Sequence, residues 1–91
     1  MSYIIKRTDT FVKTAQKFLK KHPQLIDRFK KVVEKLEESP FDPDLNTHKL
    51  KGNLKDKYGV SLSYKYRITI TIQVSEKKVT LWDIGSHDEV Y

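Results

Sequence analysis

The stretch from Arg67 to Val74 alternates strictly between polar and apolar side chains, and this alternation constrains the fold more than any other feature. A period of two over eight residues is typical of a β-strand with one buried face, and this strand is long enough to be central. We expect the polar residues to face away from a helical layer. The apolar residues expected to face that layer are Ile68, Ile70, Ile72 and Val74.

Two amphipathic helices are expected before this strand. Apolar residues recur at helical spacing over residues 11–19 and again over residues 25–36, with lysines between them. Thr8 and Asp9 can cap the first helix. Pro23 separates the two helices, because the residue before a proline is driven out of the helical conformation and a proline suits the first turn of a new helix. So short a connection predicts an antiparallel hairpin.

Three further strands are expected, over residues 3–5, 58–64 and 79–84. Residues 45–57 have no clear period and are expected to form a loop. Short connections predict that the strands over residues 58–64, 67–74 and 79–84 form an antiparallel meander. We therefore predict an α+β fold for residues 1–91, taken as one domain: an N-terminal strand, a two-helix hairpin and a three-stranded meander in one twisted sheet.

The charge of this 91-residue chain is unevenly distributed. Its formal net charge is +6, and residues 49–67 carry six lysines and arginines against one aspartate. Such a block is a candidate surface for a polyanion, although a solvated lysine-rich face is the alternative. The absence of cysteine and of an apolar membrane segment predicts a cytoplasmic protein with no disulfide. The candidate RNA-binding lysines are Lys49, Lys51, Lys55, Lys57 and Lys65.

The last seven residues combine a histidine with carboxylates and a tyrosine. Histidine can give or take a proton near neutral pH, so His87 is a candidate general acid, against the alternative of an exposed terminal side chain. Asp88 or Glu89 can orient His87 or raise its pKa. Tyr91 offers a ring that can stack on a base.

Other residues have both a chemical and a structural interpretation. Arg67 can grip a phosphate with two hydrogen bonds, or it can be a surface arginine paired with Asp83 or Glu89. His48 can be a second acid–base group or a phosphate contact, or it can anchor its loop. Trp82 can cover the outer side of the sheet or stack on a partner, but we expect it to be buried under a chain end. Three histidines so dispersed predict no metal site, and we expect no cofactor.

Three spaced segments resemble the RelE/ParE superfamily of bacterial and archaeal toxins. They are residues 48–58, residues 66–68 and residues 83–91. The tail is most similar to the YafQ-type branch. The resemblance implies a RelE-like fold and an mRNA interferase that cuts transcripts in the ribosomal A site. In such metal-independent ribonucleases a ribose 2′-OH attacks the scissile phosphate.

The resemblance also implies roles for individual residues. His87 matches the catalytic histidine, His48 a histidine of the same site, Arg67 the arginine that holds the scissile phosphate, and Tyr91 a terminal aromatic residue that shapes the site. Family members carry basic or acid–base residues on the strand occupied here by residues 59–63. The acid–base groups are therefore expected to be His87, His48 and Glu89. Expected partners are a cognate antitoxin, in a hetero-oligomer, and the ribosome with its mRNA.

Two other functions fit the same resemblance. One is a ParE-like inhibitor of DNA gyrase, which blocks its target without catalysis and needs no proton donor such as His87. The other is an inactive homologue that only binds its antitoxin. Cutting of transcripts in cells would separate the nuclease from both.

Overall fold

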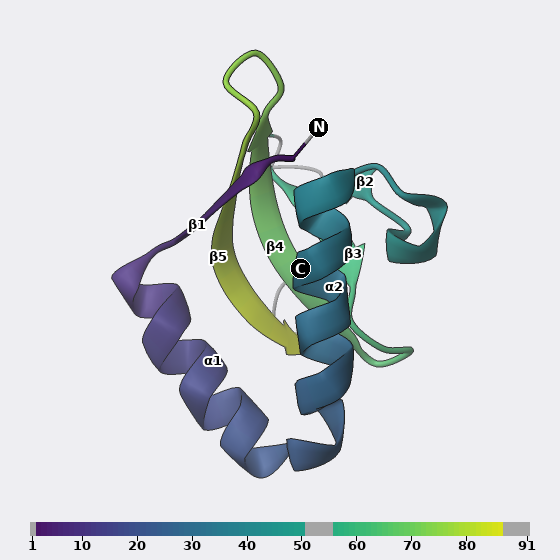
Figure 1. The fold of residues 1–91 in the computed structure, drawn as a ribbon. Coiled ribbons are helices and arrows are strands. Elements are labelled where there is room, and N and C mark those ends of the chain that lie inside the picture. Colours follow the sequence, from purple (N-terminus) through teal and green to yellow (C-terminus); the bar gives the residue numbers. More distant parts are fainter. Residues whose placement is uncertain (1, 51–55, 87–91) are drawn as a thin grey trace.

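The strands join in one mixed sheet with the order β1-β5-β4-β3-β2, in which β1 and β5 are parallel and the other pairs are antiparallel. The two α-helices lie on the same face of this sheet (Figure 1). The computed structural model describes residues 2–50 and 56–86. Its elements are β1 (Ile4–Arg7), α1 (Asp9–Lys21), η1 (Pro23–Leu25), α2 (Ile26–Glu38), η2 (Pro43–Leu45), β2 (His48–Lys49), β3 (Tyr58–Ser61), β4 (Tyr66–Gln73) and β5 (Lys78–Ser86).

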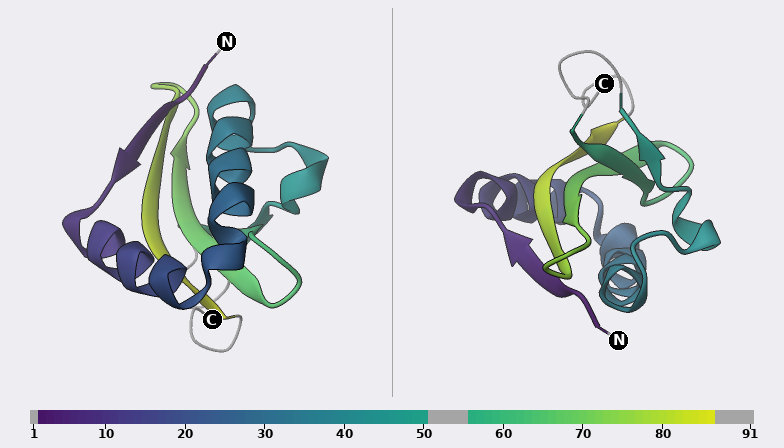
Figure 2. Two further views of the ribbon diagram at one scale, coloured as in Figure 1. Left: turned by 60° about the horizontal axis from the view of Figure 1, so that its bottom comes forward. Right: turned by 90° about the horizontal axis from the view of Figure 1, so that it is seen from above.

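The first helix begins and ends where its sequence predicts. Thr8 Oγ1 accepts a hydrogen bond from the Phe11 N–H at 3.0 Å, which satisfies one of the unpaired amides of the first turn. The helix ends at Lys21, and the chain reverses through η1, which begins at Pro23. As Figures 1 and 2 show, α1 and α2 run in opposite directions and splay apart from this turn, which confirms the predicted hairpin.

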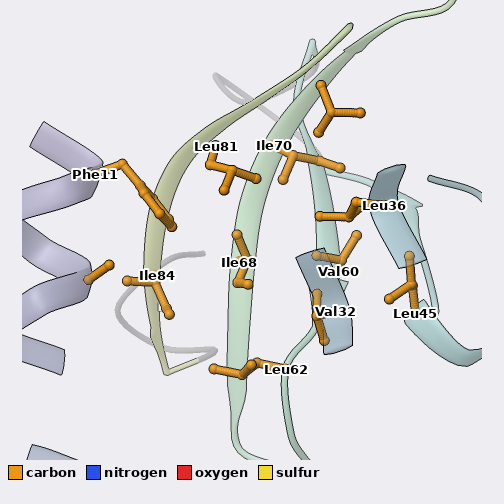
Figure 3. Packing of buried hydrophobic residues seen from close by; sticks show 12 residues of the cluster. Phe11, Val32, Leu36, Leu45, Val60, Leu62, Ile68, Ile70, Leu81 and Ile84 are labelled. Carbon is orange, nitrogen blue, oxygen red and sulfur yellow. The ribbon is translucent and has the colours of Figure 1, made fainter. Parts of the chain in front are cut away.

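The core lies between the helices and the inner face of the sheet. Figure 3 shows Val32 and Leu36 of α2 near Val60, whereas Phe11 of α1 lies near Ile84 on β5. Ile68 and Ile70 are fully buried, as their alternation predicts. The core residues are Phe11, Ala15, Val32, Leu36, Leu45, Val60, Leu62, Ile68, Ile70, Val79, Leu81 and Ile84.

Truncating Leu36 should show how much this core contributes to the free energy of unfolding. Leu36 has no exposed surface, so Leu36→Ala removes buried methyl groups and leaves a cavity. We expect the free energy of unfolding to fall by about 2–5 kcal/mol, measured by urea denaturation followed by circular dichroism. Val12→Ala is the control, because Val12 is an exposed residue of α1. Equal effects of the two changes would contradict the assigned core.

The polar–apolar alternation extends past the ends of two strands, and there the predictions are wrong. Val74 does not face the helices but is 58% exposed, in the turn after β4. The strand expected over residues 58–64 stops at Ser61, and Tyr64 is fully exposed. In that tight turn the amides of Leu62 and Ser63 both donate to the Tyr66 carbonyl. Hydrogen bonding of the turn therefore overrides the pattern.

One strand was not predicted. Residues 45–57 contain β2, in which His48 pairs with Gly59 and Lys49 pairs with Tyr58. A strand of two residues has no detectable period, so the sequence pattern could not reveal it. This strand lies at the edge of the sheet and brings His48 into the sheet next to β3.

Candidate functional site

The face of the sheet turned away from α1 and α2, called the outer face below, carries the polar residues of β4. Because Ile68 points into the core, its neighbours Arg67 and Thr69 point outward. Cross-strand pairing extends each of them into a row of residues that share this face. The Arg67 row is Ser61, Arg67 and Gly85, and the His48 row is His48, Gly59, Thr69 and Asp83.

Arg67 is held by neutral groups. Its Nη1 donates to Ser61 Oγ at 3.3 Å and to the Ser63 carbonyl at 3.2 Å. The alternative that Arg67 pairs with Asp83 is wrong, because no ion pair joins these two described residues. The Asp83 carboxylate accepts the Ile84 N–H at 2.8 Å.

No described carboxylate neutralises the charge of Arg67, which can therefore attract an anion. Within residues 2–50 and 56–86 no carboxylate forms an ion pair with it, and the Nε–Nη2 edge of the guanidinium makes no hydrogen bond. That edge can grip a phosphate with two parallel bonds. Ser61 and Ser63 fix the direction in which the edge points, so the group is oriented before a ligand arrives.

His48 is oriented by its own loop. Its Nδ1 lies 2.9 Å from the Asn46 carbonyl. A carbonyl can only accept, so in the neutral ring Nδ1 carries the proton and Nε2 carries the lone pair. The bond has the geometry of the expected loop anchor, and it also sets which nitrogen can act as a base.

The loop that carries His48 is fastened to α2. Asp42 Oδ1 accepts the Asp44 N–H at 2.9 Å, and Asp44 Oδ2 accepts from Lys35 Nζ at 3.0 Å. The hydrogen bond to the Asp44 carboxylate favours the charged ammonium and so raises the pKa of Lys35. Asn46 closes this loop in the left-handed conformation, with φ of 50°. The loop that precedes His48 is therefore joined to α2 by one ion pair.

A pocket joins this loop to Arg67. It has a volume of about 480 Å³ and is lined by Asn46, Ser61, Tyr64 and Arg67. Neighbouring strands are about 4.8 Å apart, so His48 on β2 lies roughly 10 Å to the side of β4, a gap that the two side chains can span toward one ligand. The structure thus brings two of the predicted site residues to one side of the sheet.

Three of the five lysines predicted to bind RNA lie in the described residues, each in a different local setting. Lys57 lies over the Trp82 ring, with Nζ 4.9 Å from its centroid. Lys65 lies in the turn before β4, with Nζ 5.7 Å from the Tyr66 centroid. Lys49 is exposed on the edge strand. The remaining predicted site residues, His87, Glu89, Tyr91, Lys51 and Lys55, lie outside the described residues.

Two residues of the His48 row were not among the predicted site residues. Asp83 presents an exposed carboxylate on the outer face. Thr69 is only 3% exposed, and within the described part of the chain its Oγ1 has no hydrogen-bond partner. An unpaired buried hydroxyl costs about 1–3 kcal/mol, so Thr69 is the one described residue at which the sheet bears such a cost. Thr69 stands out by its burial in the structure, and no spacing in the sequence singles it out.

Two classes of feature are missing from residues 2–50 and 56–86. No group of three or more histidine, aspartate or glutamate side chains there could hold a metal ion. None of the helices there has the length and hydropathy that crossing a bilayer requires.

Comparison with known families shows to which family the chain belongs. Residues 3–91 match the model of the family described as "Bacterial toxin of type II toxin-antitoxin system, YafQ". The chain belongs to the YafQ family. The RelE/ParE resemblance of its sequence motifs is thereby confirmed, and the protein is a type II toxin. No curated protein sequence matches the chain significantly.

Solved structures agree with this family. The Helicobacter pylori protein HP0892 is 31% identical, with a TM-score of 0.65 over 98% of this chain and 99% of its own. RelE in the RelE–RelB complex of Pyrococcus horikoshii OT3 is 24% identical, with a TM-score of 0.74 over 94% and 96%. The Escherichia coli DinJ–YafQ complex matches with a TM-score of 0.79 and 14% identity over 100% and 99%. The last two show the RelE-like fold.

Proposed function

We propose that this YafQ-family toxin is a metal-independent endoribonuclease that cleaves mRNA in the ribosomal A site. The observation that carries the proposal is the Arg67 guanidinium, oriented on the outer face and without a carboxylate partner among the described residues. A permanent charge with an available bidentate edge suits the phosphate of an RNA backbone. Membership of the YafQ family supports a nuclease over other phosphate-binding roles.

The proposed reaction is a transesterification within the RNA. His48 Nε2 or the Glu89 carboxylate takes the proton of the ribose 2′-OH, and O2′ attacks the adjacent phosphorus. Arg67 stabilises the extra negative charge of the pentacoordinate transition state. The bond from phosphorus to O5′ breaks, and His87 protonates the leaving oxygen. The products are a 2′,3′-cyclic phosphate and a 5′-hydroxyl.

The chain path supports the assignment of His87. Ser86, the last described residue, is the backbone partner of Tyr66, and Gly85 is the partner of Arg67. His87 is therefore bonded directly to Ser86, which is the neighbour in sequence of Gly85 in the Arg67 row. Tyr91, four residues later, is proposed to shape the site or to stack on a base.

Partners follow from the family and from charge. DinJ and RelB accompany the toxins in the E. coli and P. horikoshii complexes, so we assign this toxin an antitoxin with which it forms a hetero-oligomer. An acidic antitoxin would cover the basic surface and keep RNA away. The ribosome and its mRNA are the targets, which places the toxin in the cytoplasm. Lysines attract ribosomal RNA without reading its sequence. They are Lys49, Lys51, Lys55, Lys57 and Lys65.

Primer extension on mRNA from cells that express the toxin tests this function. We expect new 5′ ends within translated codons soon after induction, together with arrest of translation. Intact transcripts with stalled replication and a DNA damage response would instead indicate a ParE-like gyrase inhibitor. Normal growth at full expression would indicate a homologue that only binds its antitoxin. Either result would contradict the nuclease.

A further inference from the structure

Trp82 occupies an irregular position in the sheet. Thr69 pairs with Asp83 and Ile70 pairs with Leu81, so Trp82 is the extra residue of a β-bulge and opposes no residue of β4. The expected burial under a chain end is wrong, since 40% of its surface is exposed. Bulges often redirect a side chain next to a functional site. An exposed tryptophan at a bulge beside the Arg67 and His48 rows therefore has a candidate role in binding.

The indole is fixed on the outer face. Its Nε1 donates to Thr71 Oγ1 at 2.9 Å, and Thr71 shares the outer face with Arg67 and Thr69. The hydrogen bond satisfies the one polar atom of the ring and limits its rotation. Stacking of a ligand on this ring would therefore cost little additional side-chain entropy of the protein.

Lys57 adds a positive charge above the ring. Its Nζ lies 4.9 Å from the ring centroid, and its backbone carbonyl accepts the Leu50 N–H at 2.9 Å, which places Lys57 beside the β2–β3 ladder. The lysine stem is flexible, so a flat ligand can displace the ammonium from the ring. The ammonium can then pair with a phosphate next to that ligand.

The surroundings favour a nucleobase over an apolar protein partner. The side chains that the described residues bring into contact with the indole are polar: Thr71 accepts its Nε1–H and Lys57 lies over its ring, while Thr80 and Asp83 are the polar neighbours of Trp82 along and beside β5. An interface that buries an apolar helix would need a wider apolar area around the tryptophan. A base needs only one aromatic plane and a nearby cation, since every base has a stacking face.

We propose that Trp82 is a stacking platform for one base of the single-stranded RNA, and that Lys57 binds the adjoining phosphate. The proposal rests on the proposed nuclease function in one respect: the RNA strand that stacks on Trp82 is the one whose phosphate Arg67 binds. Thr71 lies four positions after Arg67 in β4, about 13 Å along an extended strand, which a short stretch of RNA spans. Stacking of this kind is tolerant of base identity, so it positions the RNA and does not select codons.

The protein contains a single tryptophan, so its fluorescence reports on this site directly. The probe is a short single-stranded RNA whose 2′-hydroxyls are methylated, which prevents attack on the phosphate. We expect saturable quenching with the purified full chain, and none with the same RNA in a duplex. Trp82→Ala should weaken binding, measured by RNA anisotropy, by about 5- to 150-fold, whereas Trp82→Phe keeps a stacking ring and should stay near wild type.

Two further variants separate stacking from simple coverage of the sheet. Trp82→Leu keeps an apolar cover without an aromatic plane and should bind RNA as weakly as Trp82→Ala. Lys57→Gln should lower the slope of log affinity against log salt by about 1. Wild-type binding by a folded Trp82→Leu variant, or no quenching by RNA, would overturn the proposal.

The result is independent of cleavage. If the RNA stacks on Trp82 but primer extension finds no cut transcripts, the proposed nuclease fails and the stacking site stands. If transcripts are cut but RNA leaves the fluorescence unchanged, only the stacking site fails. Quenching by an antitoxin but not by RNA would assign Trp82 to the protein interface and would also overturn the inference.

Discussion

Arg67→Ala is expected to lower the rate of mRNA cleavage by about 10²- to 10³-fold. The guanidinium is oriented by Ser61 and Ser63, and no described carboxylate neutralises it. Its removal takes a preorganised charge from the phosphate at the moment when negative charge increases. The rate is measured under single-turnover conditions on ribosomes programmed with a short mRNA, and growth arrest in cells should disappear in parallel.

Two variants show whether this loss belongs to the site. Arg7→Ala removes an exposed arginine at the end of β1 that lines a pocket with residues of α1, on the helix-covered face of the sheet and not the outer face, and should cleave like wild type. Arg67→Lys keeps the charge but loses the bidentate edge, so its rate should lie between wild type and Arg67→Ala. Full activity of a folded Arg67→Ala protein would remove the central observation on which the nuclease assignment depends.

His87→Ala is expected to lower the rate by about 10²- to 10⁴-fold, because removing a general acid leaves the 5′-oxygen to depart unprotonated. The change should leave the melting temperature near the wild-type value, since the core residues among the described part of the chain all lie before residue 87. Primer extension on cellular mRNA and single-turnover cleavage on ribosomes both measure the effect.

His22 provides a matched control for His87. Its ring packs against Phe18 and Tyr66, with centroid distances of 4.5 and 4.8 Å, as expected of a structural residue. His22→Phe preserves an aromatic ring there and removes only the titrating group, so cleavage should be retained. If His87→Ala and Arg67→Ala both remain fully toxic, the proposed mechanism is wrong.

Much of the fold follows from local sequence. The cap at Thr8, the break at Pro23 and the alternation around Ile68 and Ile70 each depend on residues close together in the chain. The family motifs add the RelE-like arrangement of these elements, which the structure confirms. Where only alternation was available, as at Val74 and Tyr64, the ends of the strands were predicted wrongly.

The candidate site was less predictable than the fold. Arg67 was placed on the outer face correctly, because a long central strand has an unambiguous phase. The bulge at Trp82, which shifts the phase of β5, was not predicted. Alternation from Val79 and Leu81 would turn Asp83 inward, yet the register pairs it with Thr69 on the outer face. A bulge depends on the pairing of two strands and leaves no mark in either sequence alone.

The amino-acid sequence by itself determined the two helices, the cap of the first at Thr8 and the central strand, since these are stabilised by contacts within a few residues. Only the tertiary structure decided that β1 joins β5 in parallel, that His48 enters the sheet opposite Gly59, and that Trp82 stands out at a bulge. The physical reason is that hydrogen bonds between strands join residues far apart in the chain. Their register is chosen by the packing of the whole sheet on its helices, which no local period encodes.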